Sequence, residues 1–236
     1  MRNSFKDQKV VIAGGSSGIG LAAARLFNAA NAQVTITGRD QSKLDKIKSE
    51  GFTAASVDSR DRRALENFFS GHGALHHLVI SLSGSKGIGM FSDLSLTTLK
   101  EGFDEKFWPV LHTLQVASPY VAAGGSITLV TAISGVAKLP GTSGLGAING
   151  GLEIMVQVIA KELKNIRINA VSPGVVDTEW WHFLDEETRQ EQFKKLTGDI
   201  PAGRPAKPEE IADAILFTAG NPYVTGKIIA CDGGLS

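Results

Sequence analysis

Gly14-Gly15-Ser16-Ser17-Gly18-Ile19-Gly20 follows the apolar run Val10–Ala13 and leads into a helical pattern that continues to Ala30. This order of strand, glycine turn and helix decides the fold. Glycines let the backbone approach a diphosphate closely, and the helix N-terminus presents free N–H groups to it. A tight turn without a ligand is the alternative interpretation of such a loop taken alone. In this context the loop predicts phosphate binding by Gly14, Ser16, Ser17, Gly18, Ile19 and Gly20.

The rest of the chain alternates short β-rich runs with helical patterns. The further strand candidates are Val34–Thr37, Thr53–Val57, Leu78–Ser81, Ile127–Val130, Arg167–Val171 and Lys227–Ala230. Strands separated by helices form parallel βαβ units with right-handed crossovers. We therefore predict one α/β domain over residues 1–236, with a doubly wound parallel sheet of about seven strands and helices on both faces. Ligands of such sheets bind at the carboxyl ends of the strands.

Composition excludes several kinds of partner. The chain has 24 Lys and Arg against 24 Asp and Glu, and no basic run is dense enough to hold a nucleic-acid backbone. Residues 1–9 are polar, and no apolar run approaches the roughly 18 residues that span a bilayer, so we expect neither a signal peptide nor a membrane anchor. Cys231 has no disulfide partner, which fits a reducing compartment. These features predict a soluble, cytoplasmic protein.

The second predicted strand ends at Thr37-Gly38-Arg39, where a dinucleotide fold commonly places an acid that binds the adenosine ribose. Here the acid is missing and a guanidinium follows, which can pair with a 2′-phosphate. We therefore predict NADP(H) as the cofactor. The alternative is that Arg39 is a solvated turn residue and Asp40 only caps the next helix. Asp58 is the candidate acceptor for the adenine amino group, unless it too is a helix cap.

Together these motifs resemble those of the short-chain dehydrogenase/reductase family over essentially the whole chain. Besides the glycine loop, the matching segments are Ile168–Thr178, Gly203–Pro205, Pro208–Ala212, Thr225–Lys227 and Asp232–Gly234. The resemblance implies a Rossmann-type sheet, a nicotinamide cofactor and a homodimer or homotetramer. It also implies cofactor contacts from residues after the fourth and sixth strands, namely Ser83, Gly84, Pro173, Gly174, Val176 and Thr178.

The catalytic residues of the family are not retained. Its Ser, Tyr and Lys positions carry Ala132, Leu145 and Asn149, and Lys106 stands where the family has Asn. In the family the phenol protonates the reduced substrate oxygen, while the Lys lowers the phenol's pKa and holds the nicotinamide ribose. General acid catalysis is typically worth about 10²–10⁴ in rate, so its loss should cripple reduction of an ordinary ketone. Activated acceptors such as quinones and vicinal dicarbonyls need less protonation.

Lys106 is the most informative of these substitutions. Its ammonium can point toward the space vacated at Asn149 and replace part of the lost role, or it can be a lysine on a helix surface. Asn149 can still bind a ribose hydroxyl as a neutral group. The hydroxyls of Thr131, Ser134 and Ser143 lie close in sequence, but a hydroxyl without a base is a poor acid.

Two other patterns are weaker candidates. Tyr223 and Lys227 have the family's catalytic spacing, but Pro222 and Gly226 exclude a shared helical face. His72, His76 and His77 have no acidic or thiol ligand spaced with them, so we expect no metal site.

The segment Asp177–Gly198 does not follow the alternation of strands and helices. It combines the aromatic residues Trp180, Trp181 and Phe183 with a charged helical run, and we call it the lid segment. The aromatic rings can enclose an apolar or aromatic carbonyl substrate, or they can simply dock the segment on the core.

Three functions from different classes fit these observations. The chain can be an atypical NADPH-dependent reductase, a cofactor-binding pseudoenzyme that senses NADP(H), or a subunit that supports an active relative. A continuous apolar stripe marks a core or interface helix for the last role: Leu145, Ile148, Leu152, Met155, Ile159 and Leu163. Gly150 and Gly151 predict the close approach of a neighbouring helix.

Overall fold

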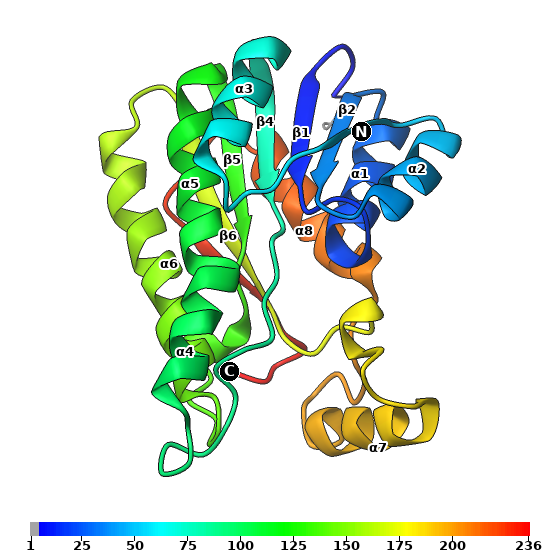
Figure 1. Cartoon of the computed structure of the whole chain (residues 1–236), viewed down its shortest axis with the longest axis vertical. Coiled ribbons are helices and arrows are strands. Elements are labelled where there is room, and N and C mark those ends of the chain that lie inside the picture. Colours follow the sequence, from blue (N-terminus) through cyan, green and yellow to red (C-terminus); the bar gives the residue numbers. More distant parts are fainter. Residues whose placement is uncertain (1–4) are drawn as a thin grey trace.

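A parallel sheet with strand order β3-β2-β1-β4-β5-β6-β7 organises the computed structural model, which describes residues 5–236 (Figure 1). Every adjacent pair in this sheet is parallel, so the predicted fold class is confirmed. The first four residues of the predicted domain lie outside the described residues. The strands are β1 (Lys9–Ala13), β2 (Gln33–Gly38), β3 (Thr53–Ser56), β4 (Leu75–Ile80), β5 (Val121–Val130), β6 (Arg167–Pro173) and β7 (Ile228–Cys231).

Helices cover both faces of the sheet. One layer contains α1 (Gly18–Ala29), α2 (Gln41–Ser49) and α8 (Pro208–Gly220). The other contains α3 (Arg62–His72), α5 (Trp108–Ala117) and α6 (Ser143–Glu162). Each layer closes a separate apolar core, because alternate strand residues point to opposite faces: Val10 and Ile12 enter one core and Val11 the other.

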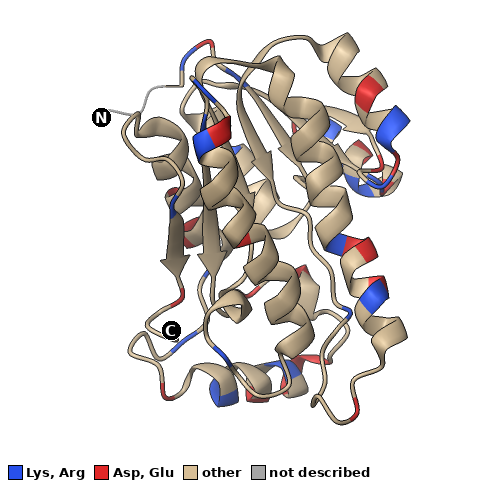
Figure 2. Cartoon of the chain, turned by 90° about the vertical axis from the view of Figure 1, so that its left-hand side faces the viewer, with Lys and Arg blue, Asp and Glu red and all other residues tan. Residues whose placement is uncertain are grey.

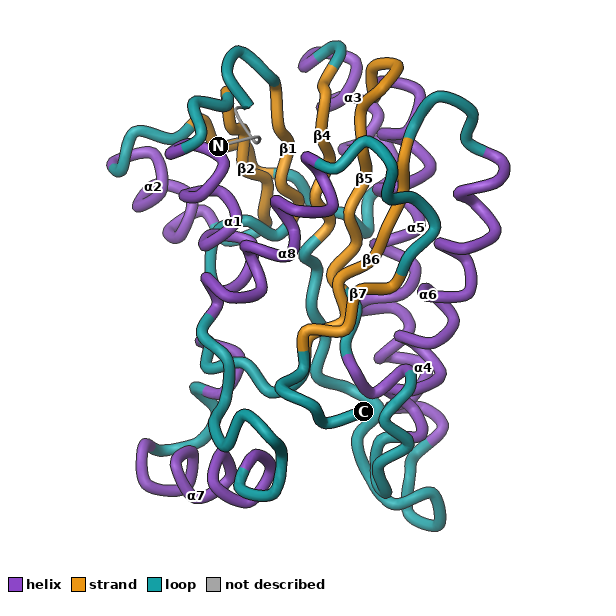
Figure 3. Tube along the Cα trace, turned by 180° about the vertical axis from the view of Figure 1, so that it is seen from behind, coloured by secondary structure: helices purple, strands orange, loops and turns teal. Residues whose placement is uncertain are grey.

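Most of the remaining elements gather at the carboxyl ends of the strands. These remaining elements are α4 (Leu96–Gly102), the π-helix η1 (Phe103–Phe107), the 3₁₀ turns η2 (Ser118–Tyr120), η3 (Ile133–Gly135) and η4 (Glu179–Trp181), and α7 (Glu186–Thr197). Apart from η2, which precedes β5, these elements lie on the side where ligands of parallel sheets bind. Figure 3 shows α4 and α7 at this end of the molecule, with α7 set apart from the helix layers.

All seven predicted strands are present, although two of them start three or more residues earlier than predicted. β5 begins at Val121, well before the predicted Ile127, and β4 begins at Leu75. The early part of β5 is Val-Ala-Ala-Gly-Gly, which has low β-propensity, and its register with β4 shifts between Leu75 and His77. A side chain at Gly125 would collide with the His76 carbonyl, so this irregular pairing requires a glycine.

α6 corrects the expectation that no segment of the chain approaches the length and apolar composition needed to span a bilayer. By length and composition alone, Ser143–Glu162 is long and apolar enough to cross a membrane. In the structure Ile148, Leu152 and Val156 of this helix are buried, and Leu152 and Val156 belong to the core beneath the sheet. The apolar residues on this face of α6 are therefore explained by their packing within the fold. The predicted cytoplasmic location stays a prediction.

Gly150 and Gly151 of α6 do lie against close neighbours within the same chain. A side chain at Gly151 would reach the Phe107 ring at 3.1 Å, and one at Gly150 would reach the Gly135 carbonyl at 3.5 Å. The neighbours are thus the junction of η1 with α5 and the turn η3. These contacts place α6 against η1, which carries Lys106, and against η3, which directly follows Ala132.

Candidate active site

The glycine loop joins β1 to α1 beneath the end of β4. Gly14 has a φ of +79°, and a side chain there would lie 2.5 Å from the Ser81 carbonyl. A side chain at Gly20 would collide with the Gly14 carbonyl. Both positions therefore need glycine, one for its backbone conformation and both for the close approach.

The N-terminus of α1 is left open toward this loop. Its N-cap residue Ser17 is extended and makes no side-chain capping bond. By contrast, Asp40, Asp61 and Asp185 accept backbone N–H bonds at the starts of α2, α3 and α7. The uncapped amides of α1 are free to bind an anion, as predicted for the loop.

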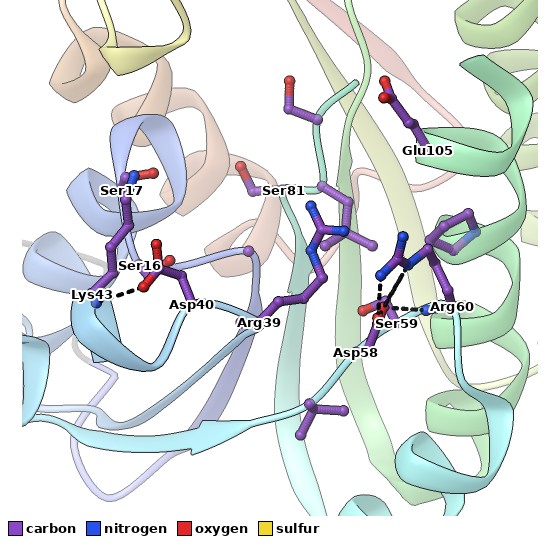
Figure 4. Close-up of a pocket in the computed structure, with 16 residues that line it drawn as sticks. Ser16, Ser17, Arg39, Asp40, Lys43, Asp58, Ser59, Arg60, Ser81 and Glu105 are labelled. Atoms are coloured by element: carbon purple, nitrogen blue, oxygen red, sulfur yellow. Dashed lines mark hydrogen bonds and ion pairs between the residues drawn. The ribbon is translucent and has the colours of Figure 1, made fainter. Parts of the chain in front are cut away.

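A cavity of about 320 Å³ opens at the ends of β1, β2 and β4 (Figure 4). Several predicted cofactor residues line it: Gly14, Ser16, Ser17, Arg39, Asp58 and Ser83. Three charged residues of the wall, Lys43, Arg60 and Glu105, were not predicted from the sequence. Nothing in their local sequence marks them, because they come from separate segments that only the fold brings together.

Arg39 is the available cation of this cavity. Lys43 pairs with Glu179 at 2.6 Å, and Arg60 pairs with Asp58 at 2.6 Å. Within residues 5–236, Arg39 makes no hydrogen bond or ion pair, and Figure 4 shows its side chain extending into the cavity. Asp40 caps α2 by accepting from Lys43 N. The Arg39 guanidinium faces the cavity (Figure 4). The helix cap of one interpretation and the cavity-facing guanidinium of the other are therefore both present.

Asp58, the predicted acceptor for the adenine amino group, lies at the cavity wall, and both of its carboxylate oxygens are engaged. Arg60 donates from Nε to each oxygen at 3.1 Å. This hydrogen bonding lowers the pKa of Asp58, so its carboxylate is held ionised. An adenine amino group would therefore share Asp58 with Arg60.

The segment after β6 closes over the glycine loop. Gly174 allows close packing, since a side chain there would lie 2.8 Å from the Asp232 Cα atom. Thr178 faces Gly18, where an added Cβ would meet its side chain at 3.5 Å. The Val176 carbonyl accepts from Trp181 Nε1 at 2.9 Å. Of the contacts predicted after the sixth strand, Thr178 is thus the one that the fold brings against the glycine loop at Gly18.

Aromatic side chains cluster at the start of the lid segment. Trp180 and Trp181 meet edge to face at 4.8 Å between ring centroids, and Trp181 packs on Phe193 of α7 in the same way. Trp180 Nε1 donates to the Gly84 carbonyl at 3.4 Å. Phe183 is 66% exposed although it contacts both tryptophans. The cluster therefore anchors the lid segment and also leaves the apolar ring of Phe183 exposed to solvent.

Asn149 retains an unused acceptor at the family's Lys position. Its Nδ2 donates to Ser134 Oγ at 3.1 Å and to the Leu145 carbonyl at 3.0 Å. Its Oδ1 is buried and has no partner. Since buried polar atoms are normally paired, this oxygen fits a ligand hydroxyl as its donor. Neither Leu145 nor Ala132, at the neighbouring positions, carries a group that transfers protons.

Lys106 is a buried residue of η1 and is only 8% exposed, so its interpretation as a surface lysine is wrong. Its Nζ donates to the Thr131 carbonyl at 3.1 Å. Burial lowers the pKa of Lys106 to about 8, against the opposing effect of Glu153. Within residues 5–236 no hydrogen bond joins Lys106 to Asn149, and the predicted replacement of the ribose contact by Lys106 stays a prediction.

The other sequence candidates lie away from these groups. Tyr223 is almost fully exposed on the loop before β7. His77 is buried at the opposite end of the sheet, between Gln8 and Ser126. Among residues 5–236, no cluster of His, Cys, Asp and Glu could hold a metal ion.

Comparison with known proteins identifies the family. The family model described as enoyl-(acyl carrier protein) reductase matches residues 13–236. The chain is a short-chain dehydrogenase/reductase. It is 32% identical to a 3-oxoacyl-[acyl-carrier-protein] reductase of Thermotoga maritima over 246 aligned positions, which cover 95% of this chain and 96% of that protein.

Solved structures of short-chain dehydrogenases/reductases superpose closely on this one. A small-chain dehydrogenase in complex with NADPH matches with a TM-score of 0.85 and 29% identity, covering 98% of this chain and 99% of the other. The NADPH-bound short chain oxidoreductase of Pseudomonas aeruginosa PAO1, described as containing an atypical catalytic center, matches with a TM-score of 0.87 and 28% identity, covering 98% of each chain.

The present short-chain dehydrogenase/reductase retains the glycine loop and carries Ala132, Leu145 and Asn149 at the positions predicted to be catalytic. Its buried charges near these positions are Lys106 and Glu153, neither of which occupies the Tyr or Lys position of the family.

Proposed function

We propose that this short-chain oxidoreductase binds NADP(H) and reduces activated carbonyl compounds. The observation that carries the cofactor assignment is the unpaired guanidinium of Arg39 in the cavity wall, which fits a 2′-phosphate. The open N-terminus of α1 fits the diphosphate, and the unpartnered Oδ1 of Asn149 fits a ribose hydroxyl. The NADPH complexes of two structural relatives support the same choice.

The reaction is limited by what the chain offers as an acid. Bound NADPH supplies a hydride to the substrate carbonyl, whose oxygen then needs a proton or a neutralising charge. Leu145 supplies neither, and Lys106 is the candidate proton donor at an altered catalytic position. With a pKa of about 8 the buried ammonium is a competent proton donor near neutral pH. Quinones and vicinal dicarbonyls delocalise the developing charge and therefore suit such a site.

The surface around the site favours an apolar or aromatic substrate. Phe183 is exposed at the lid segment, and the loop after β4 exposes Ile88, Met90 and Phe91. Gly89 N of this loop donates to the Gly141 carbonyl, which holds it against the loop before α6. Apolar side chains from three loops at the carboxyl end of the sheet can enclose a ring or short chain.

Loss of NADPH absorbance with quinones, vicinal dicarbonyls and simple ketones tests the proposal. We expect turnover only with the activated acceptors, and a large decrease in Lys106→Met. Lys100→Met is the matched control, since Lys100 is an exposed residue of the adjoining helix α4. Equal rates in both variants would exclude Lys106 from the reaction. Absence of any turnover, with NADPH binding confirmed by calorimetry, would exclude the reductase.

A cofactor-sensing pseudoenzyme is the second candidate, favoured by one contact. Lys43 in the cavity wall pairs with Glu179, the first residue of η4 in the lid segment. A bound phosphate can compete with Glu179 for Lys43 and so change the position of the lid. Hydrogen exchange of residues 177–198 with and without NADPH tests this function, and unchanged exchange would contradict it.

A further inference from the structure

Two opposite charges are buried together behind the altered catalytic positions. Glu153 lies one helical turn beyond Asn149 on α6 and is 4% exposed. Lys106 enters the same region from η1. A side chain at Gly135 would approach Glu153 Oε2 to 2.7 Å, so the glycine of η3 leaves the space that this carboxylate occupies.

Thr131 connects the two charges. Lys106 Nζ donates to the Thr131 carbonyl, while Thr131 Oγ1 donates to Glu153 Oε1 at 2.7 Å. Ser172 Oγ of β6 donates to the same oxygen at 2.8 Å. Thr131 immediately follows β5, so the ends of two neighbouring strands supply both hydroxyls.

Burying these two charged groups costs free energy unless each charge stabilises the other. An isolated ammonium or carboxylate loses its hydration on burial and tends to become neutral. The hydroxyls of Thr131 and Ser172 each donate a hydrogen bond to Glu153, and the charge of this carboxylate opposes the effect of burial on the pKa of Lys106. Among the described residues, Glu153 is the charged group that acts on the Lys106 pKa. The neighbouring carboxylate of Glu105 instead accepts from Ser85 N.

We propose that Glu153 is a positioning residue for Lys106, keeping its amine protonated and held at Thr131 as a replacement for the family's Tyr–Lys pair. The inference rests on the proposed function for its catalytic meaning. The electrostatic coupling of the two side chains can be measured without substrate or cofactor. Its failure can therefore be distinguished from failure of the reductase assignment.

The direct test is the pKa of Lys106, measured by NMR of the full chain labelled with ¹³C at the lysine ε-carbon. Lys106→Met identifies the signal. We expect Glu153→Gln, which preserves side-chain volume, to lower the Lys106 pKa by about one unit or more. Glu162→Gln, an exposed residue at the end of the same helix, should leave it unchanged. An unchanged pKa in Glu153→Gln would overturn the proposal.

A double-variant comparison covers the case in which a single variant unfolds. If the charges are coupled, Lys106→Met and Glu153→Gln each leave one buried charge uncompensated. The protein carrying both changes should then melt at a higher temperature than the less stable single variant. Additive losses, or an unfolded double variant, would contradict the coupling.

The catalytic consequence has its own readout. A rate that depends on protonated Lys106 falls as pH rises through the pKa of that amine. In Glu153→Gln this fall should move to lower pH, whereas a merely structural role would lower the rate at every pH. If the NMR shift occurs but the pH profile does not move, the coupling holds and the proposed catalytic use of Lys106 fails.

Discussion

Arg39 tests the cofactor assignment at the level of a single side chain. A guanidinium bound to a phosphate contributes about 1.5–3 kcal/mol, so Arg39→Ala should weaken NADPH binding roughly ten- to a hundredfold. NADH lacks the 2′-phosphate and should bind with unchanged affinity. Calorimetric titration with both cofactors measures the difference, and Arg63→Ala serves as the exposed control outside the cavity. Equal weakening of both cofactors would contradict the 2′-phosphate assignment.

The importance of single residues could be predicted only where they lie in a local motif. The glycine loop and Arg39 stand at fixed places after a strand, so sequence was sufficient to bring them to attention. The partners of Asp58 and Lys106 were not predictable in this way. Arg60 is close to Asp58 in sequence but has no motif, while Glu153 joins Lys106 only through Thr131 at the end of another strand.

At the scale of the element, α6 offers a gain-of-function test. Leu145→Tyr together with Asn149→Lys restores the family's pair on one helix. If the surrounding geometry is intact, carbonyl reduction should rise by about 10²–10⁴. Leu145→Tyr alone should give a smaller gain, because no neighbouring ammonium lowers the pKa of its phenol. Steady-state rates with a simple ketone measure both variants, and no gain in the double variant would show that the helix no longer presents its residues to the substrate.

The lid segment offers a second test. Glu179 competes for Lys43, so Glu179→Gln should free that ammonium and tighten NADPH binding. Because the pair is partly exposed, it is worth at most about 1 kcal/mol, and the gain should not exceed about fivefold. Glu187→Gln, on the exposed face of α7, is the control for a general change in lid charge. A Kd for NADPH that is unchanged, or raised, in Glu179→Gln would show that the ion pair does not oppose the cofactor.

Helices and strands could be predicted where the pattern of their apolar side chains matches the periodicity of the element. Val10–Ala13 is apolar on both faces and reads as a buried strand, which β1 is. Tertiary pairing overrides weak local preference in the first half of β5, where Ala and Gly form a strand beside β4. The π-helix at Lys106 was likewise not visible from spacing, although such distortions often lie at functional sites.

At the scale of the whole molecule, His77 should make stability depend on pH. Burial lowers its pKa to about 4, and a neutral ring satisfies both Ser126 Oγ and Gln8 Oε1. The unfolded chain therefore takes up a proton before the folded one does. The contribution of His77 to the free energy of unfolding is fully retained above about pH 6.5. It is lost progressively as the pH falls toward 4, by about 3 kcal/mol in all. The free energy of unfolding, measured with denaturant across this range, should change less with pH in His77→Gln than in the control His182→Gln, which alters an exposed residue. Equal slopes would contradict the linkage.

The outer face of α5 and α6 allows a test of the predicted homodimer or homotetramer. Figure 2 shows few charges on the helices of this side, and α5 contains none. Ile154 and Val158, one turn apart on α6, are 62% and 51% exposed, and Trp108 at the start of α5 is also exposed. Exposed apolar residues of this kind would suit burial against a second copy, which is the predicted homodimer or homotetramer. Ile154→Lys should then shift the protein to monomers in light scattering without lowering its affinity for NADPH. Phe91→Lys, at an exposed apolar site on the loop after β4, should leave the assembly intact, and a wild-type protein that is monomeric at high concentration would rule out this interface.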